Sequence, residues 1–435
     1  MEKKETINRR ILALALPAVA SNITVPLLGL CDTAVTGHLG KAAYIAAIAA
    51  GGMMLNVVFW VFGFLRMGTT GMTAEAYGAK DNRQLACVIS RSATLALLAG
   101  VMIVALSRPL GGLLQHIIGA EPEVAELAIR YFEICIWEAP ALLVTMSIVG
   151  WLIGMQNTVL PMIVSVSVNL INVICSLTAV FILGLGFEGV AYGTLAANWI
   201  GVGIALLALR RLAAGRRLWC GLTGLASGGL KRFFSVSAEL FLRSSCIMIV
   251  TVAVTSYGAR LGDVTLAINS VMMQFFLLFS YFIDGFAFSG EALCGKSAGA
   301  EDYPALLASV KAICRWGGGI AVAFCVLYSL FLMPAVNLLT DVAEVRAGVG
   351  NMRVFVALIP PVSVAAFLFD GFFVGLTATR RMFVTTFAAS AIFFAIMTLC
   401  PEGNNTLWIA FLTYLTVRGL GLACQLPAVI EQHKG

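Results

Sequence analysis

The sequence predicts an all-α polytopic membrane protein with twelve transmembrane helices in two pseudo-symmetric lobes of six. Three observations lead to this prediction. Of the 435 residues, 60% are hydrophobic and only 11% are charged, so the chain lacks the polar surface of a soluble globule. Twelve apolar stretches are each long enough to cross a bilayer core of about 30 Å, which takes about 20 residues of helix. Several features of the first half also recur in the second half at one fixed interval.

The twelve stretches follow one another with short polar connectors between them. Their expected limits are 10–36, 42–70, 86–107, 127–154, 158–184, 188–210, 233–257, 264–292, 307–335, 351–376, 382–400 and 405–427. Most of the 28 Lys and Arg residues lie in the connectors on the side that carries both termini. Because positive residues near span ends are held on the cytoplasmic side, we expect a multi-pass protein of the cytoplasmic (inner) membrane with both termini in the cytoplasm.

The longest polar connector is residues 211–232, which are rich in Gly and Arg and follow the sixth stretch. It predicts an N-terminal lobe (1–210), a cytoplasmic inter-lobe linker (211–232) and a C-terminal lobe (233–435). One constant shift, called the repeat interval below, superposes Gly78-Ala79 on Gly299-Ala300, Asp81 on Asp302, Leu85 on Leu306, Pro140 on Pro361, Gly150 on Gly371 and Gly154 on Gly375. This collinear set indicates a duplication, and copies that are six crossings apart run in the same direction.

Other classes of site find little support in the sequence. The eleven cysteines are scattered through apolar runs with no C-x-x-C pattern, and the three histidines lie far apart. We therefore expect no metal site and no bound cofactor. The net charge of +6 mostly reflects the charge bias of the connectors, and no basic patch interleaved with aromatic residues points to nucleic acid.

Asp32 is the first functional candidate, because it lies in an otherwise apolar run that is long enough to cross the membrane. A charged side chain inside a membrane costs several kcal/mol, about 3 on insertion scales, and is usually retained to pair, protonate or bind something. Burial among apolar helices favours the proton-bound form of a carboxyl group. A purely structural role is the alternative, in which Asp32 bonds to an Asn or Thr and holds two helices together.

Several collinear segments resemble the multidrug and toxic compound extrusion (MATE) family, in particular its DinF-like branch. They are LCDTAVTGHLG, EAYGAKD, NLINVICS, ARLGDVTLAINSV, FIDGFAFSGEALCGKSAGAED and LFDGFFVG. The resemblance covers nearly the whole chain. It implies a V-shaped, twelve-helix antiporter that expels organic, often cationic, compounds in exchange for H⁺ or Na⁺.

The resemblance assigns roles to several residues of the first half. Asp32 matches the acid of the first helix that is proposed to take up the coupling ion, and Asn169 and Asn172 are its expected neighbours. Pro17 lies four turns before Asp32, where its missing donor allows the bending that the family associates with protonation. Many relatives have an Asp at the position of Ser176, so this chain has one embedded carboxylate fewer and favours H⁺ over Na⁺. Asn169 and Asn172 could instead serve only as contacts between helices.

Three further ionisable residues of the second half lie near or within the apolar slab: Arg243, Asp284 and Asp370. Because an unpaired charge there is costly, we expect Arg243 to pair with one of the two acids. Asp370 matches an acid that NorM-like relatives use for cation coupling, but Arg243 occupies the position of their Glu. A fixed positive charge beside Asp370 argues against a sodium site, so a structural or gating role is favoured for this cluster.

These observations together predict a secondary antiporter, not an enzyme, that exports amphipathic, cationic organic compounds in exchange for H⁺ entering through Asp32. The expected partners are small organic substrates and the lipid bilayer, with no nucleic acid, and the chain is expected to be a monomer. Na⁺-coupled efflux by the same fold remains an alternative. A flippase for lipid-linked precursors is a second alternative, although such flippases tend to have a cationic cavity. An intramembrane hydrolase is disfavoured because no Ser-His motif is present.

Overall fold

All the regular structure in the described part of the chain is helical, which confirms the predicted fold class. The computed structural model describes residues 6–39, 41–118, 122–215, 220 and 230–432. The first half contains α1 (Ile7–Gly37), α2 (Ala42–Trp60), η1 (Val61–Gly63), α3 (Phe64–Gly78), α4 (Asn82–Ala105), α5 (Ser107–Ile118), α6 (Pro122–Cys135), η2 (Ile136–Glu138), α7 (Ala139–Gly154), α8 (Val159–Leu177), η3 (Thr178–Ile182) and α9 (Phe187–Leu212). The second half contains α11 (Leu230–Arg260), α12 (Asp263–Gly299), α13 (Tyr303–Leu339), α14 (Ala343–Asn351), α15 (Arg353–Gly375), α16 (Thr379–Leu399) and α17 (Asn404–Glu431).

Twelve helical segments of the described chain are long and apolar enough to cross a membrane, as predicted. Some of these crossings are built from several pieces. The short helix η1 joins α2 to α3, η2 joins α6 to α7, and η3 extends α8. The short helices α5 and α14 were not predicted, and each lies between the third and fourth crossings of its half. At 1.5 Å per residue they reach only about 18 Å or less, too short to span the bilayer core.

The chain forms two compact units, residues 20–233 and residues 1–19 together with 234–435. The predicted linker (211–232) lies at one of their boundaries, and most of it is outside the described residues. Residues 6–19 differ from the prediction because they pack with the second half. Gly285 of α12 allows this packing, since a Cβ atom there would lie 2.8 Å from the carbonyl oxygen of Ala15. The boundary within α1 falls two residues after Pro17.

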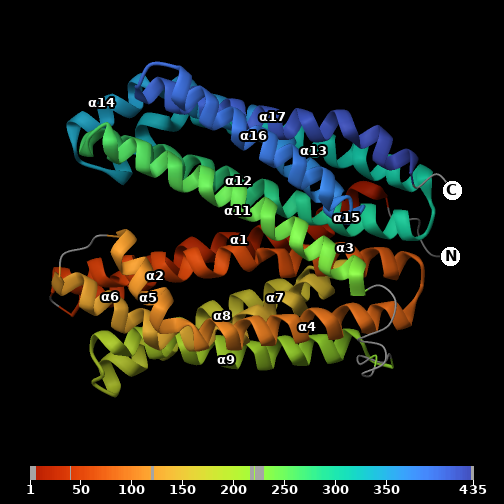
Figure 1. Ribbon diagram of the computed structural model, residues 1–435, viewed down its shortest axis with the longest axis horizontal. Helices are drawn as coiled ribbons and strands as arrows, with labels where there is room; N and C mark the ends of the chain where they lie inside the picture. Colours follow the sequence, from red (N-terminus) through yellow and green to blue (C-terminus); the bar gives the residue numbers. More distant parts are fainter. Residues whose placement is uncertain (1–5, 40, 119–121, 216–219, 221–229, 433–435) are drawn as a thin grey trace. The chain divides into compact units, whose positions relative to one another are not determined.

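The two halves pack their helices in the same pattern (Figure 1). Among residues 20–233, α7 packs against α3, α4 and α9, and α8 packs against α9. In the second half, α15 packs against α12, α13 and α17, and α16 packs against α17. When positions are shifted by the repeat interval, which separates Gly78 from Gly299, each helix of the first group falls on its counterpart in the second. The packing pattern therefore supports the duplication that the sequence indicated.

Backbone conformation repeats with the same interval. Four residues other than glycine have positive φ angles in the described chain: Lys80 (57°) and Gln156 (64°) in the first half, and Glu301 (54°) and Thr377 (51°) in the second. Each one lies two residues after a helix end, where a left-handed residue closes the last turn. The repeat interval places Lys80 on Glu301 and Gln156 on Thr377.

The repeated glycines have a steric reason. A Cβ atom on Gly150 of α7 would lie 2.4 Å from the carbonyl oxygen of Arg66 on α3. A Cβ atom on Gly371 of α15 would lie 2.4 Å from the carbonyl oxygen of Ala287 on α12. Arg66 and Ala287 are themselves separated by the repeat interval. Both halves therefore use a glycine at the same place to bring two helix backbones together.

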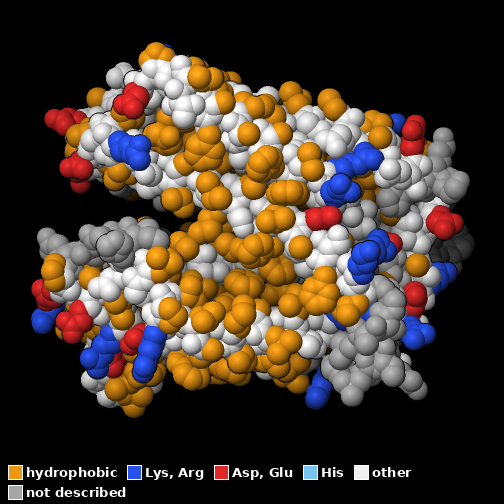
Figure 2. All heavy atoms as spheres, in the orientation of Figure 1, with side chains coloured by type: hydrophobic (Ala, Val, Ile, Leu, Met, Phe, Trp, Pro, Cys, Tyr) orange, Lys and Arg blue, Asp and Glu red, His pale blue; other side chains and the backbone are white. Residues whose placement is uncertain are grey.

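On the face drawn in Figure 2, apolar side chains cover the middle of the helices, and charged side chains gather toward the helix ends. Many large apolar side chains are exposed, for example Leu338 (88%), Ile182 (77%) and Leu207 (66%). Such exposure would be costly in water but not in lipid. The chain is a multi-pass integral membrane protein.

Candidate functional site

A buried polar cluster joins α8 to α9 in the unit of residues 20–233. The Asn172 side-chain amide donates to the Thr194 hydroxyl at 3.2 Å, and the Ser176 hydroxyl donates to the Asn172 carbonyl oxygen at 3.2 Å. Asn172 and Ser176 are 2% and 0% exposed. Gly193 of α9 makes this contact sterically feasible, because a Cβ atom there would lie 2.3 Å from the Ser176 hydroxyl oxygen. The helices α8 and α9 therefore approach each other closely at Ser176.

Asn169 contacts α1 rather than this cluster. Its side-chain amide donates to the Thr24 hydroxyl at 2.7 Å, and Thr24 donates to the carbonyl oxygen of Ser21. In the described part of the chain, neither Asn169 nor Asn172 is bonded to Asp32, although the sequence led us to expect both beside it. Residues three apart on a helix point about 60° apart, which is enough to direct one amide to α1 and the other to α9.

Asp32 lies on α1, five residues before the end of the helix and therefore nearer to one membrane face than to the middle. Its side chain is partly buried, and its Oδ1 atom accepts no hydrogen bond from any described residue. The carboxyl group is within electrostatic range of Tyr131 and Cys135 on α6. Tyr131 also interacts with the Thr194 side chain, which connects Asp32 indirectly to the cluster on α8 and α9.

A second buried acid of this unit, Glu138, was not predicted from the sequence as a site residue. It lies in η2 and is 5% exposed, and its Oε2 atom accepts a hydrogen bond of 2.8 Å from the Asn198 amide of α9. Asn198 also donates to the backbone carbonyl of Thr194, one turn earlier on the same helix. The signal that could have revealed Glu138 is its place near the middle of the predicted crossing 127–154, where a charged residue is as unusual as it is at Asp32.

The second half contains a separate buried charge cluster. Asp370 of α15 forms ion pairs with Arg243 of α11 and with Arg418 of α17. All three residues are 4–5% exposed. Of the two acids considered for Arg243, the structure therefore pairs it with Asp370. Asp284 of α12 accepts a hydrogen bond of 3.3 Å from Ser280.

The second arginine, Arg418, lies inside the predicted crossing 405–427. Its guanidinium group also lies 6.0 Å from the ring centre of Phe367. Two arginines and one aspartate give the cluster a formal charge of +1. A net positive charge disfavours the binding of a further cation at this cluster.

Comparison with known proteins decides the family. The model of the MatE family matches residues 17–178 and 237–399, which is one segment in each half. The chain belongs to the MATE family. Over 412 residues it is 37% identical to DNA damage-inducible protein F of Escherichia coli K12. The aligned region covers 94% of this chain and 90% of that protein. The resemblance seen in the sequence is therefore confirmed.

More distant relatives and solved structures agree with this assignment. The chain is 24% identical to Protein DETOXIFICATION 44, chloroplastic, of Arabidopsis thaliana over 428 residues, covering 95% of this chain and 81% of that protein. A crystal structure of a MATE protein in the bent conformation matches with a TM-score of 0.85 at 18% identity, covering 99% of this chain and 98% of the other. A MATE protein in the straight conformation matches with a TM-score of 0.83. These structures support the fold of the present MATE protein.

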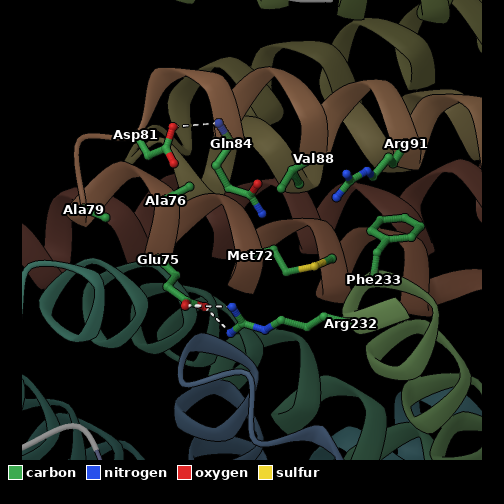
Figure 3. A pocket seen from close by; sticks show the side chains of 10 residues that line it. All are labelled: Met72, Glu75, Ala76, Ala79, Asp81, Gln84, Val88, Arg91, Arg232 and Phe233. Atoms are coloured by element: carbon green, nitrogen blue, oxygen red, sulfur yellow. Dashed lines mark hydrogen bonds and ion pairs between the residues drawn. The ribbon is translucent and has the colours of Figure 1, made fainter. Parts of the chain in front are cut away.

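This MATE protein also has a polar pocket where α3, α4 and the start of α11 meet (Figure 3). Arg232 donates two hydrogen bonds to Glu75, at 3.0 and 2.6 Å, and Phe233 and Met72 supply apolar lining. Asp81 lies at the far side, where it caps α4 by accepting from the backbone amide of Gln84. The Arg232 side chain is 52% exposed, so this ion pair lies in contact with solvent. The pocket joins the end of the linker to the first half rather than forming part of the buried clusters.

Proposed function

We propose that this MATE protein exports amphipathic organic cations across the cytoplasmic membrane in exchange for protons that enter through Asp32. The observation that carries the proposal is the buried Oδ1 atom of Asp32, which accepts no hydrogen bond from the described residues. A carboxylate in this setting is costly, whereas a protonated carboxyl group is not. The side chain therefore has a physical reason to exchange a proton with each transport cycle.

The surrounding groups favour H⁺ over Na⁺. A sodium ion needs several oxygen ligands, but the Asn172 carbonyl oxygen already accepts a bond from Ser176, and the Asn169 amide donates to Thr24 rather than to Asp32. Ser176 supplies a neutral hydroxyl where an acid would add a second negative charge. Proton uptake needs only one carboxyl group and is not limited by the number of oxygen ligands.

Pro17 gives the first helix a place to bend as Asp32 changes its charge. Proline removes one backbone hydrogen bond and weakens the helix on its N-terminal side. The boundary between the two compact units falls within one turn of Pro17, so a bend there would move one part of α1 with each unit. With both termini in the cytoplasm, the Asp32 end of α1 would lie toward the outer face, where protons enter.

The test uses purified protein in liposomes that contain ethidium, a planar organic cation. A pH gradient or a sodium gradient is imposed separately, and efflux is followed by fluorescence. We expect the pH gradient alone to drive wild-type transport and Asp32→Asn to abolish it. Asp302→Asn is the matched control, because Asp302 is an exposed helix-capping aspartate and Asn caps equally well. Transport driven by sodium alone would refute proton coupling, and wild-type rates for Asp32→Asn under a pH gradient would refute the role of Asp32.

A flippase for a lipid-linked pyrophosphate is the second candidate function, and the cluster around Asp370 is the observation that favours it. Arg243 and Arg418 outnumber Asp370, so this part of the membrane interior carries a net positive charge that suits an anionic headgroup. The same liposomes can be loaded with a fluorescent undecaprenyl-type pyrophosphate instead of ethidium. Translocation of this lipid without ethidium efflux would favour the flippase.

A further inference from the structure

Glu138 has an unusual position for an acidic residue. The crossing that contains it runs from Pro122 to Gly154, and Glu138 lies at its midpoint. At 1.5 Å per residue, it is about 24 Å along the helix from either end. The helix narrows to a 3₁₀ turn at this point (η2), and Pro140 follows two residues later. A 3₁₀ turn in the middle of a helix often marks a functional hinge or a strained sequence.

The partners of Glu138 are neutral. Its carboxylate accepts from the Asn198 amide, and no Lys, Arg or His in the described chain forms an ion pair with it. A carboxylate bonded to one amide at mid-membrane is costly, but a carboxyl group that holds a proton can keep the same hydrogen bond. This setting contrasts with Asp370, whose charge is matched by two arginines.

Glu138 is connected to Asp32 through a stripe of side chains. Tyr131, Cys135 and Glu138 are spaced by four and three residues, so they lie on one face of α6 and η2. Tyr131 and Cys135 are each within electrostatic range of both acids. The Thr194 hydroxyl of α9 interacts with Tyr131, and Asn198 follows Thr194 by one turn.

The other elements that pack against η2 bring no further charge to Glu138. The helix α9 contacts Glu138 through Asn198, and Gly100 of α4 packs beside the adjoining first turn of α7. A Cβ atom on Gly100 would lie 2.4 Å from the Cα atom of Pro140, so α4 presents only backbone there. In the described chain, the titratable groups within electrostatic range of Glu138 are thus Tyr131 and Cys135 of the preceding helix α6.

The duplication shows that the fold does not require these polar side chains. Under the repeat interval that separates Gly78 from Gly299, Glu138 corresponds to Ile359. The counterparts of the other members of the network are Met352 for Tyr131, Phe393 for Asn172, Met397 for Ser176 and Leu415 for Thr194. All five counterparts are buried in one apolar cluster of the second half. The same helix packing is therefore satisfied by apolar side chains, and the polar set of the first half has another reason to exist.

We propose that Glu138 is a second proton-binding carboxyl group of the first half, and that it takes the place of the acid missing at Ser176. The inference deepens the proposed proton coupling and rests on it. Protonated Asp32 releases its proton to the Tyr131 hydroxyl, which lies within electrostatic range of both acids and accepts one proton as it passes its own on to Glu138. The Glu138 carboxylate becomes a neutral carboxyl group at mid-membrane, and Asp32 is left as a carboxylate that can take the next proton from outside.

Glu138→Gln is the decisive variant. The glutamine carbonyl oxygen can still accept from Asn198, so the fold keeps its hydrogen bond while the proton site is lost. Glu138→Asp is the conservative variant that keeps a carboxyl group. Glu126→Gln is the matched control, because Glu126 lies three turns earlier on α6 and is exposed. All variants are compared with Asp32→Asn.

The readout is infrared difference spectroscopy of the protein in lipid nanodiscs after a pH change, which detects the carbonyl band of each protonated carboxyl group. We expect Glu138→Gln to lose one band that wild type, Glu126→Gln and Asp32→Asn retain, and Glu138→Asp to show that band at a shifted position. The spectra require no transported substrate and no sodium. An unchanged carboxyl spectrum in Glu138→Gln overturns the proposal whatever ion drives transport.

Ethidium efflux under a pH gradient supplies the second readout. We expect Glu138→Gln to lose efflux, Glu138→Asp to recover part of it and Glu126→Gln to match wild type. If wild type responds to the pH gradient and Glu138→Gln responds equally well, proton coupling stands and the role of Glu138 is refuted. If wild type responds only to a sodium gradient, the proposed function fails, and the infrared spectra alone then decide whether Glu138 binds a proton.

Discussion

The ion cluster around Asp370 predicts that substitutions of Asp370 and of its partner Arg418 have very different effects on stability. Asp370→Asn removes the single negative charge that serves both Arg243 and Arg418, and leaves two guanidinium groups buried together. Arg418→Met removes the excess positive charge and leaves one balanced pair. The sign of the net charge, rather than the number of lost hydrogen bonds, determines which variant suffers more.

The magnitudes follow from burial. The three residues are 4–5% exposed, so solvent screening is weak. Breaking a buried ion pair from one side costs about 3–5 kcal/mol, and because Asp370 serves two arginines we expect about 5 kcal/mol for Asp370→Asn. Arg418→Met leaves Arg243 paired with Asp370 and creates no uncompensated buried charge, so we expect about 1 kcal/mol or less for this variant. The unit has roughly 220 residues, for which each kcal/mol shifts Tm by about 2–4 °C, or roughly 10–20 °C in total for Asp370→Asn.

The assay is thermal unfolding in detergent, followed by the reaction of buried thiols with a maleimide dye. Cys294 is buried in the second half and reports its unfolding, after the exposed thiols Cys400 and Cys424 have been blocked. Cys87 and Cys135 report the first half in the same way and serve as the internal control. Equal shifts for Asp370→Asn and Arg418→Met, or a shift under about 2 °C for Asp370→Asn, would refute the reasoning from net charge.

Three further predictions concern the repeated scaffold and the polar pocket. Gly371→Ala should cost about 1–3 kcal/mol in thermal unfolding, since its Cβ atom meets a backbone carbonyl at 2.4 Å, whereas Gly319→Ala in open space should not destabilise. Asp81→Ala and Asp302→Ala should each lower stability by about 1 kcal/mol, because both side chains cap a helix; unequal losses would contradict their equivalence. Glu75→Gln should change Tm by less than about 2 °C, because the guanidinium group of its partner Arg232 is half exposed and solvent screens the ion pair. A large fall in Tm for this variant in about 1 M salt would instead indicate a buried ion pair that salt does not screen.

Much of the fold was predictable because the bilayer fixes the length of an apolar helix. The twelve crossings and the duplication follow from run lengths and from residues such as Gly150 and Gly371, whose steric roles are local to a helix pair. The breaks at η1 and η2 were not predicted, since they depend on how the neighbouring helices pack. The packing of residues 6–19 with the second half depends on Gly285, which is distant in the sequence and shows no signal of its contact.

The candidate site was predictable only where one residue carried the signal alone. Asp32 is an isolated charge in an apolar run, so its cost in a membrane marks it. The pairing of Arg243 could be narrowed to two acids, but the choice of Asp370 depends on the rotation of three helices about their axes. The bond between Asn172 and Thr194 depends on the register of α8 against α9, which periodicity within one helix does not give.

The two halves share a scaffold but place their polar residues at positions that do not correspond. Asp370 and Arg418 of the second half correspond to Val149 and Ala197 of the first, just as Glu138 corresponds to Ile359. Each half therefore combines the shared helix packing with its own buried polar set. In the buried polar set of the second half, Asp370 is held by two cations, Arg243 and Arg418. The acids of the first half, Asp32 and Glu138, have no cation as a partner among the described residues, so they can exchange protons without leaving a buried cation unpaired. This difference supports the proposal of proton exchange in the first half and of a fixed structural or gating role in the second.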